Sequence, residues 1–241
     1  WELPEVGRAG RDGVSPPGDK MTGGRAMDAR SERITAEFKH SGESVEVPAG
    51  ASGGTTTGTG FLIGPDRVLT NHHVVAPVIA GDAAPEGVLL RFDFKRLANG
   101  TTLYDGTPYR LAADWLIDCS PHSSADVQLS PTAPPSEEEL DYALLRIDPP
   151  AGEDPIATAA GHDPNAPTRG WIDLPDGVTT FAPDTPLLIL QHPEDEALKL
   201  AFETQSVIGL NENGTRVRYR TNTGPGSSGA PCFDAEWRPV A

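Results

Sequence analysis

Apolar residues in this chain come mostly in short runs, and glycine, proline or aspartate interrupts these runs again and again. The chain holds 26 glycines and 24 prolines, together 50 of its 241 residues. Frequent turn residues between short apolar runs are typical of proteins built from many short strands rather than from long helices. The sequence therefore predicts an all-β fold, and its length is sufficient to bury a core.

Several segments have the length and the flanking turn residues that strands require. They are TGFLIG at 59–64, RVLTN at 67–71, VLLRFDF at 88–94, YALLRID at 142–148, PLLILQ at 186–191, LKLAF at 198–202 and SVIGLNENGTRVRYRT at 206–221. The last of these is expected to form a hairpin that turns near Asn213-Gly214. Two shorter alternating segments, RITAEF at 33–38 and SVEVPA at 44–49, have the pattern of edge strands.

The strand segments form two groups, which indicates two small β-barrels. Residues 1–52 mix glycine, proline and charge without a period, and we interpret them as an N-terminal extension or linker, partly irregular. Residues 53–155 are expected to form the first barrel and residues 156–241 the second. A Gly/Pro/Ala/Asp-rich stretch at 149–170 has the composition of a connection between them.

Charge and hydropathy exclude several classes of function. A formal net charge of −16 would repel a phosphate backbone, so we expect no nucleic-acid partner. No apolar run reaches the roughly 18 residues that cross a bilayer, so we expect no membrane insertion. The two cysteines, Cys119 and Cys232, are too few for a disulfide framework, and reduced thiols favour a cytoplasmic location. The chain begins at Trp1 without a visible signal peptide, which suggests a piece of a longer protein.

Three motifs carry chemistry: GTGFLIGPDRVLTNHHVV at 58–75, ELDYALLRI at 139–147 and PGSSGAP at 225–231. A serine hydroxyl becomes a good nucleophile when an imidazole accepts its proton, and a carboxylate must orient that imidazole. Glycines let the backbone present N–H groups to the developing oxyanion. The chain supplies all three kinds of residue, in the order His, Asp, Ser.

LTNHHVV, DYALLRI and GSSGAP resemble the three catalytic blocks of the trypsin-like (chymotrypsin-fold) serine proteases, and the likeness extends over residues 58–241. The bacterial branch is the most similar, including trypsin-like peptidase domains of multidomain proteins in defence and signalling systems. The resemblance implies two six-stranded β-barrels with the active site between them. It also implies a serine endopeptidase that acts on polypeptides through an acyl-enzyme, without a cofactor or a metal, and with fused regulatory or effector domains.

The resemblance also assigns the general base and its carboxylate. The family places its histidine directly before VV, which makes His73 the base, and it makes Asp141 the residue that orients it. His72 is adjacent, and neighbouring side chains of an extended segment point to opposite sides, so both histidines are not expected to face one serine. The sequence places no cysteine and no third histidine near them at ligand spacing, which argues against a shared metal.

The nucleophile follows from the family pattern Gly-x-Ser-Gly. This pattern makes Ser228 the attacking residue and Ser227 the intervening one. The backbone N–H groups of Gly226 and Ser228 are then expected to form the oxyanion hole.

Two further residues are expected to bind substrate. The residue six before the nucleophile commonly lies at the floor of the family's specificity pocket, and here it is Asn222, followed by Thr223. A neutral amide does not neutralise a buried Arg or Lys, so no strong trypsin-like preference is expected. In the family a substrate-pairing strand follows the nucleophile, and the sequence stops at WRPVA, about where that strand would begin, so the second barrel is expected to be incomplete. The alternative function is a catalytically silent protease fold used for docking.

Overall fold

We analysed the protein in a computed structural model. The structure describes residues 43–48, 55–96, 99, 101–127, 134–157, 165–177 and 179–241. The segment RITAEF, predicted as an edge strand, lies outside these residues. Within them the chain consists mostly of strands, which confirms the predicted all-β class.

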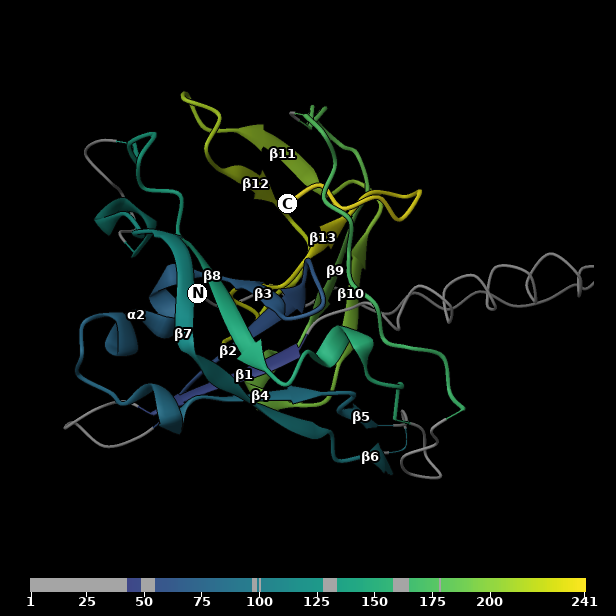
Figure 1. The fold of residues 1–241 in the computed structure, drawn as a ribbon. Coiled ribbons are helices and arrows are strands. Elements are labelled where there is room, and N and C mark those ends of the chain that lie inside the picture. Colours follow the sequence, from purple (N-terminus) through teal and green to yellow (C-terminus); the bar gives the residue numbers. More distant parts are fainter. Residues whose placement is uncertain are drawn as a thin grey trace, which may run out of the picture. The chain divides into compact units, whose positions relative to one another are not determined.

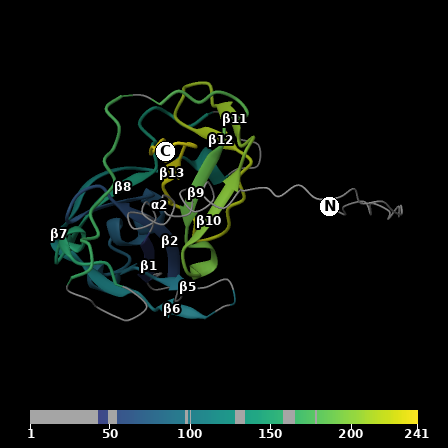
Figure 2. The ribbon, with the colours of Figure 1, turned by 90° about the vertical axis from the view of Figure 1, so that its right-hand side faces the viewer.

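Six strands close into a barrel in the order β1-β2-β3-β8-β7-β4, and every neighbouring pair is antiparallel (Figures 1 and 2). Their bounds are β1 Glu43–Pro48, β2 Thr55–Leu62, β3 Arg67–Thr70, β4 Leu89–Phe92, β7 Thr107–Ser120 and β8 Tyr142–Asp148. A short pair, β5 Lys95–Arg96 and β6 Thr102–Tyr104, lies between β4 and β7 in the chain.

Side-chain alternation explains how the barrel forms its core. Along β8 every second residue is buried, so Ala143, Leu145 and Ile147 point inward. They pack with buried valines, leucines and Phe92 from the other strands in one hydrophobic cluster. β8 has the same bounds as the segment YALLRID at 142–148 that was predicted from sequence.

β1 lies before residue 53, so the barrel includes residues that the sequence assigned to an extension. The reason is that Val45 and Val47 are fully buried in the barrel core. The sequence of β1 predicts this burial only weakly, because the segment has six residues and lies next to Gly-rich neighbours.

The second group of strands forms two small sheets among the described residues. β9 Leu187–Gln191 is central, with β10 Lys199–Glu203 on one side and β13 Cys232–Phe233 on the other, as both views show (Figures 1 and 2). β11 Val207–Leu210 and β12 Val217–Tyr219 form the predicted hairpin around Asn213-Gly214. These sheets do not close into a barrel within the part of the chain that the structure describes, so the second barrel stays a prediction.

One α-helix, α2 His72–Ile79, follows β3 among the described residues and buries Val74, Val75 and Val78 against the barrel core. No helix in those residues combines the length and apolar character that crossing a membrane requires. The connection after β8 returns along the first barrel, because Ile172 N–H donates to the carbonyl of Leu62 in β2. This backbone contact joins the second part of the chain to the barrel.

Candidate active site

His73 and Asp141 are held together at the edge of the barrel. The carboxylate of Asp141 accepts two hydrogen bonds from His73, one from ring Nδ1 at 2.8 Å and one from the backbone N–H at 3.0 Å. The side-chain amide of Asn71 donates to the carbonyl of Asp141 at 2.7 Å. Asp141 has a φ of 54°, which turns the chain immediately before β8. The Nδ1 contact therefore orients the His73 ring, and the backbone contact holds the residue itself against the same carboxylate.

The two adjacent histidines are not extended, as the sequence suggested, because both belong to the first turn of α2. Successive residues of a helix are rotated by about 100°, so their side chains diverge here too. His73 meets Asp141, while Nδ1 of His72 lies 3.4 Å from Nδ1 of His122, a residue just after β7. The expectation that no third histidine lies nearby was therefore wrong.

The environment of His72 favours its neutral form. Burial lowers its pKa from 6.5, and the neighbouring His122 lowers it further, whereas Asp141 acts in the opposite direction. His72 and His122 are both half-buried, so solvent can reach them.

The Ser228 turn separates the two adjacent serines. The hydroxyl of Ser227 accepts a hydrogen bond from the N–H of Gly224 at 3.2 Å, so it is directed back into the turn. The turn is closed by two backbone hydrogen bonds of Ser227, whose N–H donates to Gly224 at 3.1 Å and whose carbonyl accepts from Ala230 at 3.0 Å. Gly229, with a φ of 86°, allows the sharp exit from the turn, because a Cβ there would lie 2.1 Å from the carbonyl oxygen of Thr59.

Thr59 of β2 anchors this turn to the barrel. Its N–H donates to the carbonyl of Ser228 at 2.7 Å, and its hydroxyl donates to the carbonyl of Gly226 at 2.8 Å. The same hydroxyl accepts a hydrogen bond from the N–H of His192 at 3.0 Å. Thr59 is fully buried, so these contacts are shielded from water.

The peptide before Gly226 has a defined orientation. The carbonyl of Pro225 accepts a hydrogen bond from the N–H of Glu194 at 2.6 Å. In a trans peptide the C=O and N–H point in opposite directions, so the N–H of Gly226 points away from Glu194. Among the described residues, neither the N–H of Gly226 nor that of Ser228 has a hydrogen-bond acceptor. Neither N–H is therefore engaged by a protein acceptor within the described residues, and of the two residues only Ser228 lines the cavity described below.

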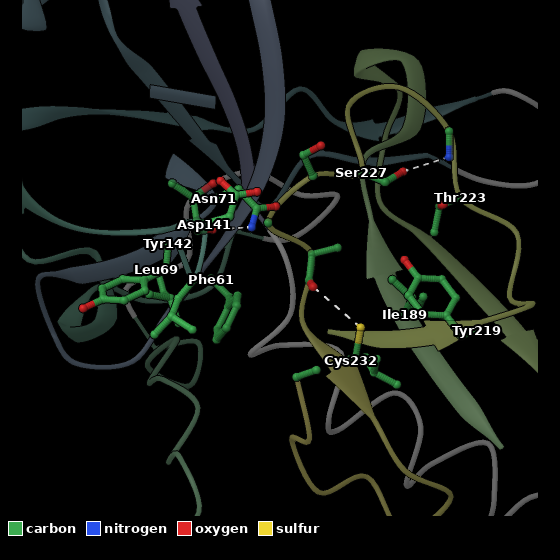
Figure 3. Close-up of a pocket in the computed structure, with 18 residues that line it drawn as sticks. Phe61, Leu69, Asn71, Asp141, Tyr142, Ile189, Tyr219, Thr223, Ser227 and Cys232 are labelled. Carbon is green, nitrogen blue, oxygen red and sulfur yellow. Dashed lines mark hydrogen bonds between the residues drawn. The ribbon is translucent and has the colours of Figure 1, made fainter. Parts of the chain in front are cut away.

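Ser228 and Asp141 both line a cavity of about 390 Å³ (Figure 3). Figure 3 shows Asn71, Asp141 and Tyr142 from the barrel on one side of it, and Ile189 and Tyr219 from the second group of strands on the other. In the part of the chain that the structure describes, no hydrogen bond joins the hydroxyl of Ser228 to His73. The structure thus brings His73 and Asp141 into contact. Ser228 lines the cavity, and its hydroxyl is not hydrogen-bonded to His73.

Only one of the two predicted substrate-binding residues lines the cavity. Thr223 lines both the cavity and a second hollow beside Pro193, whereas Asn222 is exposed and lines only the second hollow. The wall of the cavity near Thr223 is neutral, because burial raises the pKa of Cys232 to about 12 and also raises the pKa of Tyr219. Both groups therefore keep their protons at neutral pH.

Sequence reasoning missed three residues that the structure places around the site: Thr59, Asn71 and His122. Thr59 stands between two glycines and Asn71 directly precedes the histidine pair, so both lay inside the quoted motifs. His122 carried no local signal, because it is 50 residues from His72 in the chain.

Comparison with known proteins defines the family. The family model described as a trypsin-like peptidase domain matches residues 58–241, and the chain belongs to this family. The uncharacterized protein y4fB of Sinorhizobium fredii (strain NBRC 101917 / NGR234) is 25% identical over 207 residues, which cover 81% of this chain and 26% of that protein. The chain therefore spans about a quarter of the length of this curated relative.

Solved structures agree on the fold. The active form of the Rv3671c protease from M. tuberculosis has a TM-score of 0.51 and 16% identity, covering 94% of this chain and 81% of that chain. Deg5 has a TM-score of 0.52 and 13% identity, covering 89% of this chain and 83% of that chain. At these identities the likeness concerns the fold alone.

Proposed function

We propose that this trypsin-like peptidase domain is an active serine endopeptidase with Ser228 as nucleophile, His73 as general base and Asp141 as the residue that orients the base. The observation that carries this proposal is the pair of hydrogen bonds from His73 to Asp141, 2.8 Å and 3.0 Å long, together with the cavity that Asp141 and Ser228 both line. A carboxylate on Nδ1 keeps the proton on that nitrogen and leaves Nε2 free to accept one.

The proposed reaction has two stages. The hydroxyl of Ser228 attacks the peptide carbonyl, its proton passes to Nε2 of His73, and the tetrahedral intermediate collapses when His73 protonates the leaving amine. Water then hydrolyses the acyl-enzyme with the same base. The N–H groups of Gly226 and Ser228 would stabilise both oxyanions, and their lack of protein acceptors supports this role. A hydrogen bond between Ser228 and His73 is expected to form when substrate fills the cavity.

Ser228 is preferred over Ser227 for a geometric reason. The hydroxyl of Ser227 is engaged by the N–H of Gly224 within the turn, and only 8% of the residue is exposed. Ser228 lies between Ser227 and Gly229, and its carbonyl is fixed by Thr59. Its side chain carries no such internal hydrogen bond among the described residues.

The part of the cavity lining that comes from the second group of strands supports a preference for neutral side chains before the cut. Ile189, Thr223, Tyr219 and the protonated thiol of Cys232 offer no carboxylate to a buried Arg or Lys. An unpaired charge buried there would be costly. We expect a peptide-library cleavage profile dominated by uncharged residues at this position. A profile dominated by Arg or Lys would contradict the preference without contradicting the peptidase activity.

We further propose that the chain is a peptidase part of a larger bacterial protein, with an effector role in defence or signalling. Its coverage of only 26% of the curated relative supports a multidomain context. The alternative is a catalytically silent fold that docks a partner.

The experiment that separates these two functions is labelling with a fluorophosphonate probe, which reacts with activated serines. We expect the wild-type chain and Ser227→Ala to be labelled and Ser228→Ala to remain unlabelled, with the modified residue located by peptide mass spectrometry. Ser227→Ala is the matched control because it removes the neighbouring hydroxyl from the same turn. A folded wild-type chain that never reacts would favour the docking function.

A further inference from the structure

Three potential metal ligands from separate segments meet beside the proposed base. His72 begins α2, His122 follows β7 and Asp141 precedes β8. One ligand atom from each lies within 4.8 Å of the others, and all three side chains are half-buried. The two imidazoles present Nδ1 to Nδ1 at 3.4 Å, with ring centroids 5.6 Å apart.

This spacing matches two ligands of one metal ion better than a hydrogen bond between two rings. Zn²⁺ binds imidazole nitrogen at about 2.0–2.1 Å in tetrahedral geometry, which places two such nitrogens about 3.3–3.4 Å apart. An N–H···N hydrogen bond would be near the long limit of its range at the observed distance. Two imidazoles and a carboxylate suit Zn²⁺ and similar transition metals, whereas Ca²⁺ and Mg²⁺ prefer oxygen ligands alone.

We propose that His72, His122 and Asp141 form a binding site for a divalent transition-metal ion such as Zn²⁺, and that the bound ion inhibits the peptidase. The ion would be held by Nδ1 of both histidines and by the carboxylate of Asp141, with a water molecule in the remaining position. The inhibitory part rests on the proposed function, while the binding part does not.

Inhibition follows from the shared carboxylate. Asp141 is the partner of both His73 donors, at 2.8 Å and 3.0 Å, so a metal ion that draws on this carboxylate competes with the contacts that orient the base. His73 must also become positively charged when it accepts the proton of the nucleophile, and a dication nearby opposes that charge. The ring of His122 is 6.1 Å from the ring of His73, which places such an ion close to the base.

Binding can be tested independently of activity by calorimetric titration of ZnCl₂ into the untagged chain. We use Ser228→Ala as a second background in which peptidase activity is abolished and the three ligands remain. Both backgrounds should bind one Zn²⁺, and MgCl₂ and CaCl₂ should give no binding heat. Loss of outer-shell partners of metal ligands costs about 10–100-fold in affinity, so His122→Gln and His72→Asn, which remove direct ligands, should each weaken binding by at least about ten-fold.

The matched control for binding is Asp118→Asn, which removes an exposed carboxylate of β7 outside the three-residue cluster and should leave the affinity unchanged. Failure of the wild-type chain to bind Zn²⁺ would overturn the site. Binding that is equally strong in His122→Gln and His72→Asn would overturn it as well, since the ion would then be held elsewhere.

Inhibition can be tested by the rate at which the fluorophosphonate probe labels Ser228. We expect ZnCl₂ to slow labelling of the wild-type chain by at least about ten-fold, a chelator to restore it, and His122→Gln to resist the ion. Labelling that is unaffected by bound Zn²⁺ would overturn inhibition and leave the site standing. If the chain is never labelled even without metal, the proposed function fails, while the titration still decides whether the site exists.

Discussion

Asp141 has two roles at this site. Its carboxylate accepts a hydrogen bond from a backbone N–H in the first turn of α2, and it accepts another from Nδ1 of the His73 ring. An amide in its place would present an NH₂ group to His73 and favour the tautomer that carries its proton on Nε2, which cannot accept one from Ser228. We therefore expect Asp141→Asn to lower kcat on a fluorogenic peptide by about 10⁴-fold.

The matched control for this variant is Asp118→Asn. Asp118 is an exposed carboxylate of β7 that accepts a hydrogen bond from the hydroxyl of Tyr142 at 2.7 Å, so it tests the loss of a nearby charge without touching His73. Its kcat should remain close to that of wild type. If both variants behave alike, Asp141 does not orient the base.

His72 makes a second prediction at the residue scale, this time on stability. Its pKa is lowered from 6.5 in the folded chain by burial and by His122. The unfolded chain therefore binds a proton in a pH interval just below 6.5 where the folded chain does not, so stability falls as the pH falls through that interval. Replacement by asparagine removes this effect.

We expect His72→Asn to lose less free energy of unfolding than wild type between about pH 7 and about pH 5, as measured by urea denaturation. Its labelling by the fluorophosphonate probe should remain near the wild-type rate at neutral pH, because His72 takes no part in the proposed proton transfer. A variant that is more acid-sensitive than wild type would show that His72 gains, rather than loses, proton affinity on folding.

At the scale of elements, the contact between β2 and the Ser228 turn is what connects the barrel to the nucleophile. Thr59→Val would keep the side-chain shape and remove the hydroxyl, which leaves the carbonyl of Gly226 and the N–H of His192 without this buried partner. Each buried polar group left unsatisfied costs about 1–3 kcal/mol. We expect lower stability in urea and slower probe labelling of Ser228.

Thr59→Ser separates the hydrogen bonds from the volume of the side chain, because it keeps the hydroxyl and removes only a methyl group. It should restore most of the labelling rate that Thr59→Val loses. Equal labelling rates in wild type and Thr59→Val would mean that the turn holds its geometry without β2.

The same elements show which features the sequence could predict. The run YALLRID gave the bounds of β8 correctly, because a short apolar run that ends at Pro149-Pro150 has few other interpretations. His72 and His73 were expected on an extended segment, and β-branched residues and Pro77 disfavour a helix in the segment HHVVAPVI. It is helical because Val74, Val75 and Val78 are buried together against the barrel, a tertiary contact that overrides local preference.

Across the whole molecule, the features that local sequence could not predict are contacts between distant residues. His122 reaches His72 from 50 residues away, and Thr59 reaches Gly226 from 167 residues away. The three motifs could be found because the proposed chemistry requires their residue types and because the family pattern places them in that order. The chemistry does not specify which residue types position those motifs. Such residues can therefore be identified only from the folded structure.

The connection between the two groups of strands is secured by a buried ion pair. Nη2 of Arg169 donates to Oδ2 of Asp93 at 2.8 Å, and the two side chains are only 1% and 4% exposed. Arg169 also lies over the rings of Phe92 and Tyr109, at 5.0 Å and 5.6 Å. Lys95 Nζ also lies 3.8 Å from Asp93, but breaking the closer buried pair by removing one partner typically costs about 3–5 kcal/mol.

We therefore expect Arg169→Met and Asp93→Asn each to lower the free energy of unfolding by about 3–5 kcal/mol. Asparagine suits position 93 because the backbone φ there is 62°, a conformation that asparagine tolerates. The double variant should lose clearly less than the sum of the two single losses, since it buries neither charge alone. Urea denaturation of all four proteins gives the cycle, and strictly additive losses would mean that the two residues stabilise the connection independently.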